Sequence, residues 1–420
     1  MAEITIQGGQ RLNGTVSLSG AKNSAFKLMI ASLLSHREVN LTNVCRIADV
    51  ELVKEIILQL GGQVKADANY FKLQADNLQS FTVPQSLGQA SRASSLFLAP
   101  LLARFQQAIM PLPGGDQIGE RRLNWHFAGL QALGAKIKLK NQLIYATCPV
   151  LKGGNYTFPE PTHTGTETLI MAAVLARGKT ILKNCALEPE VDDLIAFLTQ
   201  MGAKITRQAP RTIIINGVKD LGSASYSVMP DRNEAVSYAI AALITQGNIL
   251  VKHAREQDLT AFLTKLTEIG AGFKVLSEGI RFYYHQPLRA VNIKTAPHPG
   301  FMTDWQPLWS VLATQFQGQS QVTDTIFPHR FQFVPLLLAM GAKISQMPGS
   351  IKIIGPAKLQ GQKLTIPDIR AGATLVLAGL CARGETVLTG VEHLNRGYEN
   401  FIGHLQALGA KINNLQGQSL

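Results

Sequence analysis

Cysteine is scarce in this 420-residue sequence. The four cysteines, Cys45, Cys148, Cys185 and Cys381, are isolated from one another and form neither a CxxC pair nor a Cys/His group. This spacing argues against a disulfide framework and against a zinc site. We therefore predict four buried thiols in a protein of a reducing compartment.

Long apolar runs and long basic runs are also missing. The longest apolar runs lie near residues 26–34 and 94–105, and Pro100 interrupts the second, so neither predicts a membrane span. The first residues, MAEITIQGGQ, lack the apolar core of a secretory signal, which leads us to expect a cytoplasmic protein. The net charge is +12, but without a block of five or more Lys and Arg residues it favours a phosphate-rich small molecule over nucleic acid as the ligand.

The composition predicts a well-packed globular protein, with 46% hydrophobic and 16% charged residues. A single hydrophobic core stops growing at about 250–300 residues, so a chain of 420 residues predicts two domains.

A sixfold repeat is the strongest internal signal. A tag of the form LGAKI recurs about every 70 residues, for example as ALGAKIK and QMGAKIT. The first glycines of the six tags are Gly61, Gly134, Gly202, Gly270, Gly341 and Gly409. Each glycine is predicted to end a helix in a left-handed conformation, and the alternating segment that follows is predicted to be a strand.

A second tag in every repeat joins an apolar helix to a β-rich run, as in AAVLARGKTIL. Each repeat should therefore hold two helices and about four short strands. Six such repeats favour two domains of three repeats over one solenoid, whose repeats usually have about 20 to 45 residues. Two lobes would leave a cleft, where small-molecule sites usually lie.

Several charged residues stand at predicted helix starts. Lys22 and Asn23 begin the apolar helix of LSGAKNSAFKLMIASLL, which predicts an anion site; the alternative is that Asn23 caps the helix and Lys22 is solvated. Arg92 begins another helix in SRASSLF. The segment PLPGGDQIGERR, residues 111–122, is either a hairpin with a solvated aspartate or a loop that carries Asp116 as an acid ahead of Arg121.

Later repeats carry Asp304 in HPGFMTDWQ, Arg330 in FPHRF, Asp368 with Arg370 in IPDIRAGATL, and Arg396 in LNRGYENF. Taken singly, each arginine is more often a surface or salt-bridge residue. Because they recur at corresponding ends of the repeats, together they would bring positive charge to the cleft.

These residues occur within a series of motifs in a definite order: GAKN, RAS, LPGG with IG.R, EPE, PDR, TAPHP with TD, F..RF, DIRA, RGYE and the last LGAKI. Over its whole length the chain resembles the UDP-N-acetylglucosamine 1-carboxyvinyltransferase (enolpyruvyl transferase) family. The resemblance implies an α/β fold of two inside-out α/β barrel lobes, each of three β-α-β-α-β-β units. One lobe would span 22–229 and carry the catalytic loop 111–122, and the other would comprise 1–21 and 230–420.

The resemblance also implies a reaction: the enolpyruvyl group of phosphoenolpyruvate passes to the 3′-hydroxyl of UDP-N-acetylglucosamine with release of phosphate. This is the first committed step of peptidoglycan precursor synthesis, and it requires neither cofactor nor metal. Asp304 matches the base and Asp116 the acid. Lys22, Arg121 and Arg396 match the clamp on the donor phosphate, with Arg92 beside it. Arg330 and Arg370 match contacts to the donor carboxylate or contacts made on closure. The implied nucleotide-sugar contacts are Asn23, Arg92, Arg121, Arg122, Leu123, Asn124, Trp125, Thr162, His163, Thr164, Asp304 and Ile326.

Three departures from the family pattern bear on the substrate. Asp116 replaces the usual loop cysteine, which implies resistance to fosfomycin. Arg122-Leu123-Asn124-Trp125 follows Arg121 where the family usually has RPVDL, and Thr162-His163-Thr164 stands within the usual PSVGATE. A paralogue acting on another nucleotide or nucleotide-sugar is therefore an alternative, as is a binding or regulatory homologue without activity. A shikimate-phosphate enzyme is disfavoured, because it usually has Ser-Lys-Ser where this chain has Lys22-Asn23-Ser24.

Overall fold

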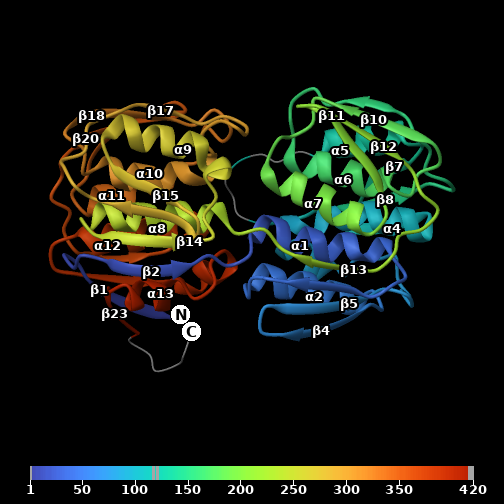
Figure 1. The fold of residues 1–420 in the computed structure, drawn as a ribbon, viewed down its shortest axis with the longest axis horizontal. Helices are drawn as coiled ribbons and strands as arrows, with labels where there is room; N and C mark the ends of the chain where they lie inside the picture. The colour runs from blue at the N-terminus through green and yellow to red at the C-terminus, as the bar shows by residue number, and fades with distance from the viewer. Residues whose placement is uncertain (1, 116–118, 120–122, 415–420) are drawn as a thin grey trace. The chain divides into compact units, whose positions relative to one another are not determined.

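The computed structural model describes residues 2–115, 119 and 123–414 (Figure 1). The chain divides into two compact units. One, called here the 20–229 unit, comprises Gly20–Met229. The other, called the 230–420 unit, comprises the chain from Pro230 onward together with the residues up to Ser19.

The 20–229 unit contains three repeats. Its inner helices are α1 (Lys22–Ala31), α4 (Leu98–Phe105), which continues the 3-10 helix η2 (Arg92–Phe97), and α6 (His163–Ala173). Its other helices are η1 (Ser32–Leu34), α2 (Ala48–Gln59), α3 (Gln85–Ala90), α5 (Asn124–Ala132) and α7 (Pro189–Gln200). Its strands are β3 (Val39–Thr42), β4 (Gln63–Asp67), β5 (Tyr70–Gln74), β6 (Gln107–Pro111), β7 (Lys136–Lys140), β8 (Leu143–Thr147), β9 (Asn155–Thr157), β10 (Lys179–Lys183), β11 (Lys204–Ala209), β12 (Thr212–Asn216) and β13 (Ala224–Ser227).

The 230–420 unit repeats the same plan. Its inner helices are α8 (Arg232–Ile244), α10 (Gln306–Ala313), preceded by η3 (Thr303–Trp305), and α12 (Ile369–Cys381). Its other helices are α9 (Glu256–Ile269), α11 (Val334–Ala339), η4 (Val391–Arg396) and α13 (Phe401–Ala407). Its strands are β1 (Glu3–Gln7), β2 (Asn13–Ser17), β14 (Asn248–Lys252), β15 (Gly272–Leu276), β16 (Gly279–Tyr283), β17 (Ile293–Lys294), β18 (Gly318–Thr323), β19 (Lys343–Met347), β20 (Ser350–Gly355), β21 (Lys363–Thr365), β22 (Glu385–Thr389) and β23 (Lys411–Asn414).

Every repeat contributes one sheet, and five of the six described sheets share one pairing pattern. A first strand lies parallel to its neighbour, and an antiparallel pair follows, as in the order β9, β10, β12, β11. The sheet β6-β8-β7 has three strands, and a single parallel bridge between Thr82 and Ile109 stands where the fourth would be. The predicted β-α-β-α-β-β repeat is confirmed, with three open sheets in each unit and no closed barrel among the described residues.

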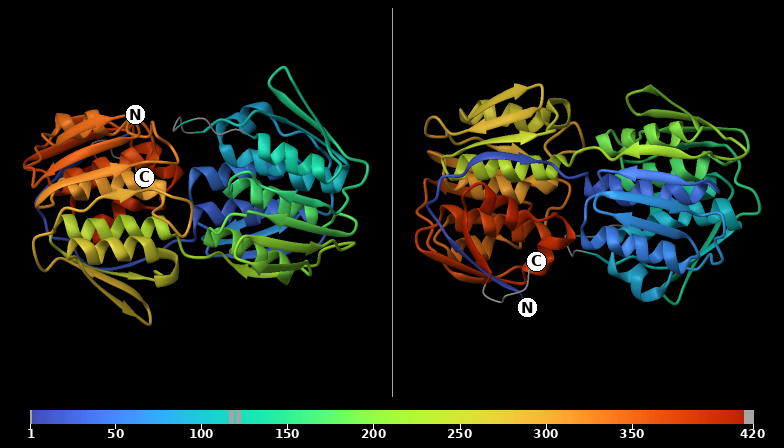
Figure 2. Two further views of the ribbon diagram at one scale, coloured as in Figure 1. Left: turned by 90° about the horizontal axis from the view of Figure 1, so that it is seen from above. Right: turned by 60° about the horizontal axis from the view of Figure 1, so that its bottom comes forward.

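The N-terminal strands belong to sheets formed mostly by the C-terminal half of the chain. β1 pairs with β22 and β23, and β2 lies parallel to β14. In Figures 1 and 2 both strands are blue within a unit otherwise coloured yellow to red. Residues 3–17 therefore complete two sheets of the 230–420 unit.

The inner helices are predominantly apolar, which is why they lie in the interior. Every residue of α8 and α10 is buried, and α8, α10 and α12 pack against one another. The polar first turns of α8 and α12 are buried as well, with Arg232 and Glu234 in α8 and Arg370 in α12. Buried polar groups need partners, so the helix starts are where interactions concentrate.

The six repeat glycines end their helices as predicted. Their φ angles range from +79° at Gly270 to +105° at Gly409, the left-handed region that disfavours residues with a Cβ. Each is followed by a strand, for example β7 after Gly134. The tag therefore marks the same helix-to-strand turn in all six repeats.

Replacing Gly202 with alanine should lower the free energy of unfolding by about 1–2 kcal/mol. The φ of Gly202 is +100°, and a Cβ there would meet no atom within 4 Å, so the cost is conformational only. Gly222→Ala is a matched control, because Gly222 has no positive φ and its Cβ would meet only the Met201 carbonyl oxygen at 3.5 Å. Urea denaturation should show a lower midpoint for Gly202→Ala alone, and equal midpoints for the two variants would contradict this explanation.

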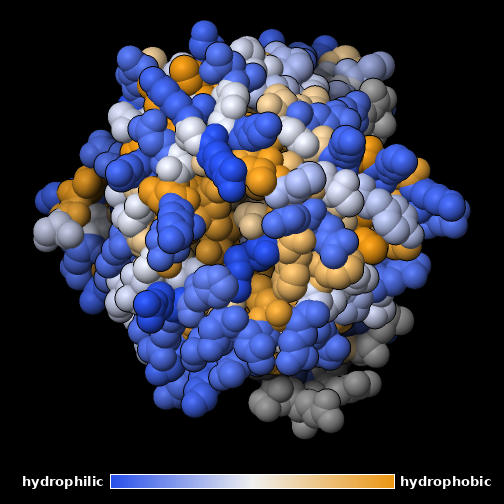
Figure 3. Space-filling model, turned by 90° about the vertical axis from the view of Figure 1, so that its right-hand side faces the viewer, coloured by the Kyte–Doolittle hydropathy of each residue, from blue (hydrophilic) through white to orange (hydrophobic). Residues whose placement is uncertain are grey.

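None of the four cysteines, all within the described residues, forms a disulfide. Cys45, Cys148 and Cys185 are buried as predicted, but Cys381 is only partly buried, because it is the last residue of α12, where the helix leaves the core. Among the described helices, none combines the length and the apolar character needed to cross a membrane. On the face shown in Figure 3, hydrophilic residues predominate and apolar residues form small separate patches.

Candidate active site

In the 230–420 unit, aspartates cap two of the inner helices. The Asp231 carboxylate accepts hydrogen bonds from the backbone N–H groups of Asn233 at 2.6 Å and Glu234 at 3.3 Å. Asp368 does the same at α12, where it accepts from the N–H groups of Arg370 and Ala371. These caps fix the first turns, so the side chains that follow have defined directions.

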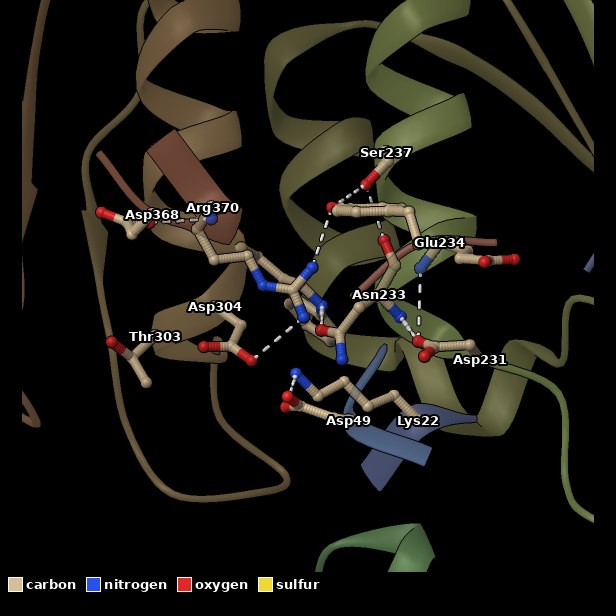
Figure 4. A network of polar contacts seen from close by, with 12 residues as sticks. Lys22, Asp49, Asp231, Asn233, Glu234, Ser237, Thr303, Asp304, Asp368 and Arg370 are labelled. Carbon is tan, nitrogen blue, oxygen red and sulfur yellow. Dashed lines mark hydrogen bonds and ion pairs between the residues drawn. The ribbon is translucent and has the colours of Figure 1, made fainter. Parts of the chain in front are cut away.

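Asp304, Arg330 and Arg370 lie together. Arg330 Nη1 donates to Asp304 Oδ1 at 2.6 Å. Arg370 Nη2 donates to Asp304 Oδ2 at 3.3 Å (Figure 4). The arginine side chains are 7% and 8% exposed, whereas that of Asp304 is 19% exposed. The candidate base is thus the counter-ion of two nearly buried guanidinium groups.

A second set of hydrogen bonds holds Arg370. Arg370 Nη1 donates to the Tyr398 hydroxyl at 2.8 Å, and this hydroxyl lies 2.8 Å from Ser237 Oγ. Burial disfavours the charged form of Arg370, but Tyr398 and Asp304 outweigh it and raise the pKa of Arg370 above its ordinary value. Arg370 therefore remains a cation within the core.

Arg330 is positioned through the loop that follows β18. It donates to Thr303 Oγ1 at 3.2 Å, and Thr303 in turn donates to Asp324 at 2.7 Å. Asp324 also accepts the backbone N–H groups of Ile326 and Phe327, both at 2.9 Å. The half-buried Ile326, one of the predicted nucleotide-sugar contacts, is thereby fixed in the same loop.

The PDR motif supports the segment that carries Asp304. Arg232 Nη1 lies 3.2 Å from His298 Nδ1, and its guanidinium lies 5.8 Å from the centre of the Trp305 ring. Trp305 Nε1 donates to Asn233 Oδ1 at 3.1 Å. Next to them, burial and the neighbouring Asp231 raise the pKa of Glu234 to about 8.

In the 20–229 unit, Lys22 is the first residue of α1, and Ala21 is its N-cap. Lys22 Nζ pairs with Asp49 Oδ2 at 2.8 Å, and its side chain is 14% exposed. The alternative of an Asn23 cap with a solvated Lys22 is therefore wrong. Asn23 is half-buried, in the first turn of the same helix.

Arg92 begins η2 after Ser91, whose hydroxyl accepts the N–H of Ala93. Arg92 acts electrostatically on His126, a buried histidine that the sequence analysis did not select. Burial, and then the charge of Arg92, lower the pKa of His126 to about 3, so its ring is neutral. His126 Nε2 lies 2.9 Å from Thr164 Oγ1, which connects the start of α5 to the Thr162-His163-Thr164 turn.

The remaining predicted contacts lie at two helix starts. Leu123 is buried, Asn124 is exposed and Trp125 is half-buried at the beginning of α5. Thr162 caps α6 by accepting the N–H of Gly165 at 3.4 Å, and His163 is the first residue of that helix.

Some predictions fall elsewhere. Asp116, Arg121 and Arg122 lie outside the described residues. Arg396 is half-buried at the end of η4, two residues before Tyr398. Within the part of the chain that the structure describes, no group of three or more His, Cys, Asp or Glu residues could hold a metal ion.

Four residues of the buried polar networks were not predicted from the sequence: Tyr398 and Ser237 beside Arg370, and the ion pair of Lys27 with Glu167. Tyr398 lies within the RGYE motif, so its signal was present but unassigned. Lys27 stands as one charge within the apolar run AFKLMIA, a pattern that predicts a buried, paired lysine.

Comparisons with known proteins agree with this architecture. The family model described as EPSP synthase (3-phosphoshikimate 1-carboxyvinyltransferase) matches residues 6–405. The UDP-N-acetylglucosamine 1-carboxyvinyltransferase of Desulfosudis oleivorans is 41% identical over 98% of this chain and 99% of its own, and that of Gluconobacter oxydans is 42% identical over 98% and 99%.

Solved structures share the fold. The enolpyruvyl transferase NikO from Streptomyces tendae superposes with a TM-score of 0.90 at 23% identity, covering 98% of this chain and 99% of that one. EPSP synthase from Acinetobacter baumannii gives 0.78 at 17% identity, over 99% of this chain and all of that one. The resemblance inferred from the motifs is confirmed: the chain belongs to the EPSP synthase family of 1-carboxyvinyl (enolpyruvyl) transferases.

Proposed function

We propose that this protein transfers the enolpyruvyl group of phosphoenolpyruvate to the 3′-hydroxyl of UDP-N-acetylglucosamine and releases phosphate. The observation that carries the proposal is the carboxylate of Asp304 held between Arg330 and Arg370, with the names of the relatives at about 41% identity as support. The reaction would serve peptidoglycan precursor synthesis in the cytoplasm.

The donor carries a carboxylate and a phosphate, so its site needs several cations. Arg330 and Arg370 suit the carboxylate, because their planar guanidinium groups bind such anions with two parallel hydrogen bonds. Lys22, Arg121 and Arg396 are assigned to the phosphate, with Arg92 beside them. Lys22 at the first turn of α1 adds the positive end of a helix dipole.

Asp304 can act as a base only after its arginines find another anion. If it took a proton in the ligand-free protein, two nearly buried guanidinium groups would lose their counter-ion, which is costly. The donor carboxylate provides a replacement at Arg330 and Arg370. Donor binding would thus free the Asp304 carboxylate from its arginines, so the donor must be bound before Asp304 takes the proton of the acceptor hydroxyl.

The chemistry then balances without a cofactor. Asp304 takes the proton of the acceptor hydroxyl while the hydroxyl oxygen bonds to C2 of the donor. Asp116 gives a proton to the C3 methylene carbon. The product is a tetrahedral adduct. The Asp116 carboxylate then takes a proton back from C3 as the bond between C2 and the phosphate oxygen breaks, which restores the double bond as an enol ether. The proton held by Asp304 leaves with the phosphate, and the cations stabilise the departing phosphate.

For the acceptor, particular residues of this chain favour a second candidate. Thr162, His163 and Thr164 add side chains at the turn assigned to the diphosphate, and Asn124 is exposed at the start of α5. Asn124 can accept the uracil N3–H through its carbonyl oxygen. These substitutions favour, as the second candidate, another nucleotide or nucleotide-sugar as the acceptor.

Phosphate release measured with phosphoenolpyruvate and a panel of acceptors tests the proposal. The panel contains UDP-N-acetylglucosamine, other UDP-sugars, UMP and shikimate 3-phosphate. We expect the highest kcat/KM with UDP-N-acetylglucosamine. A higher value with another nucleotide would establish the second candidate, and no release with any acceptor would indicate a homologue that only binds.

Lys22→Ala and Arg396→Ala should each raise the donor KM by tens-fold. Each removes charge-assisted hydrogen bonds worth about 1.5–3 kcal/mol, and about 1.4 kcal/mol corresponds to a factor of ten. Lys136→Ala is the control, because Lys136 is exposed on β7. Steady-state kinetics with varied donor gives the answer, and a donor KM unchanged in both variants would remove these residues from the clamp.

A further inference from the structure

Three ionisable groups meet in the core of the 20–229 unit. Lys27 from α1 lies between His163 and Glu167 of α6, with its Nζ 2.8 Å from His163 Nε2 and 2.6 Å from Glu167 Oε1. The side chains of Lys27 and Glu167 are 2% and 0% exposed, and that of His163 is 21% exposed. Charges this deep are stable only as partners of one another.

The contact between Lys27 and His163 indicates which ring nitrogen of His163 carries the proton. A lysine ammonium only donates hydrogen bonds, so His163 Nε2 must present a lone pair to it at 2.8 Å. The ring is then neutral and its proton is on Nδ1. Among the described residues Nδ1 has no hydrogen-bond partner, so the proton is available to a ligand.

The Glu167 carboxylate can accept one more hydrogen bond. Its Oε1 accepts from Lys27 and also lies 3.1 Å from His163 Nε2. Its Oε2 is buried and has no hydrogen-bond partner among the described residues. Buried carboxylate oxygens are nearly always paired, so the cluster is one donor short. If Nε2 gained a proton, it could donate to Oε1, and Lys27 could turn to Oε2.

The surrounding charges set the cost of that proton. Burial and the ammonium of Lys27 disfavour a charged His163, whereas Glu167 on the same helix and Glu188 before α7 favour it. The net effect raises the pKa of His163 above its usual value of 6.5. An anion at the start of α6 would add a further favourable charge and would lie at the positive end of the helix dipole.

We propose that the Lys27–His163–Glu167 cluster couples binding of the acceptor diphosphate to uptake of one proton by His163. This inference rests on the proposed function, because it takes the ligand to be a nucleotide diphosphate at the Thr162-His163-Thr164 turn. The complex would hold an imidazolium that donates through Nδ1 to a phosphoryl oxygen and through Nε2 to Glu167.

A definite pH dependence follows. Acceptor affinity is highest below the His163 pKa of the free protein and falls as the pH rises toward the higher pKa of the complex. Within that window the dissociation constant increases by up to about tenfold per pH unit, the limit for one linked proton. A diphosphate diester has no group that titrates near neutral pH, so the proton comes to the protein.

Isothermal titration calorimetry of the full chain with UDP-N-acetylglucosamine tests the proposal. Titrations at pH 7.5 in two buffers with different ionisation enthalpies yield the number of protons taken up. We expect net proton uptake, of at most one proton, for the unmodified protein and uptake close to zero for His163→Gln, which keeps a donor but cannot titrate. His36→Gln, which replaces an exposed histidine, should retain the uptake.

A second variant addresses the buried carboxylate. Glu167→Gln keeps the shape of the side chain but removes the charge that stabilises the imidazolium, so proton uptake should fall. Binding without proton uptake, or equal uptake in the His163→Gln variant, would overturn this inference and leave the proposed function intact. Absence of both binding and phosphate release with every acceptor would overturn the two together.

Discussion

Asp304→Asn should lower kcat by about 10²–10⁴-fold, the usual contribution of a positioned general base. Asparagine has the same shape but cannot take the proton of the acceptor hydroxyl. It also no longer competes with the donor carboxylate for Arg330 and Arg370, which both bind Asp304 in the ligand-free protein. We therefore expect donor affinity to be unchanged or tighter while turnover is lost.

The two effects are separated by measuring donor binding directly and phosphate release in a single turnover. Asp192→Asn is the matched control, because Asp192 also pairs with an arginine, Arg207, but its own side chain is 57% exposed. Circular dichroism should show that both variants are folded. Normal phosphate release by folded Asp304→Asn would exclude Asp304 as the base, and weaker donor binding would exclude competition between Asp304 and the donor.

Asp116→Cys should convert a fosfomycin-resistant enzyme into one that the epoxide inactivates with time. The family resemblance assigns Asp116 to the loop position where a cysteine thiolate is alkylated. A thiolate is a soft, strong nucleophile, whereas a carboxylate attacks an epoxide far more slowly. We expect the unmodified protein to retain full activity during incubation with fosfomycin and the variant to lose it progressively.

The control is Asp116→Ala, which removes the acid and should abolish turnover. Mass spectrometry of the treated cysteine variant should find one fosfomycin adduct on the peptide that contains position 116. An active Asp116→Cys variant that is never inactivated would contradict the assignment. Normal turnover by Asp116→Ala would favour the solvated hairpin aspartate instead.

The fold was predictable because its signals are local and recur. Each LGAKI tag combines a glycine that tolerates positive φ with a strand of alternating residues, and the same turn appears six times. The helix starts at Lys22 and Arg92 were predictable for the same reason, since polar residues there precede apolar runs.

The contacts within the candidate site were not predictable, because they join residues distant in the sequence. Arg370 reaches Asp304 across 66 residues, and Lys27 reaches Glu167 across 140. The sequence suggested that Arg330 and Arg370 face the donor, but it could not reveal that the candidate base pairs with both. It also gave no sign that His126 would be neutral and bonded to Thr164, since that depends on burial beside Arg92.

The position of β1 has a consequence for the order of events during synthesis on the ribosome. β1 is among the first segments made, yet both of its hydrogen-bonding neighbours, β22 and β23, are among the last. The 20–229 unit has all its strands once Ser227 has emerged, because β13 completes the sheet begun by β3. The nascent chain should therefore carry one folded unit while β1 remains unpaired, and the sheet that contains β1 should close only after β23 has left the ribosome.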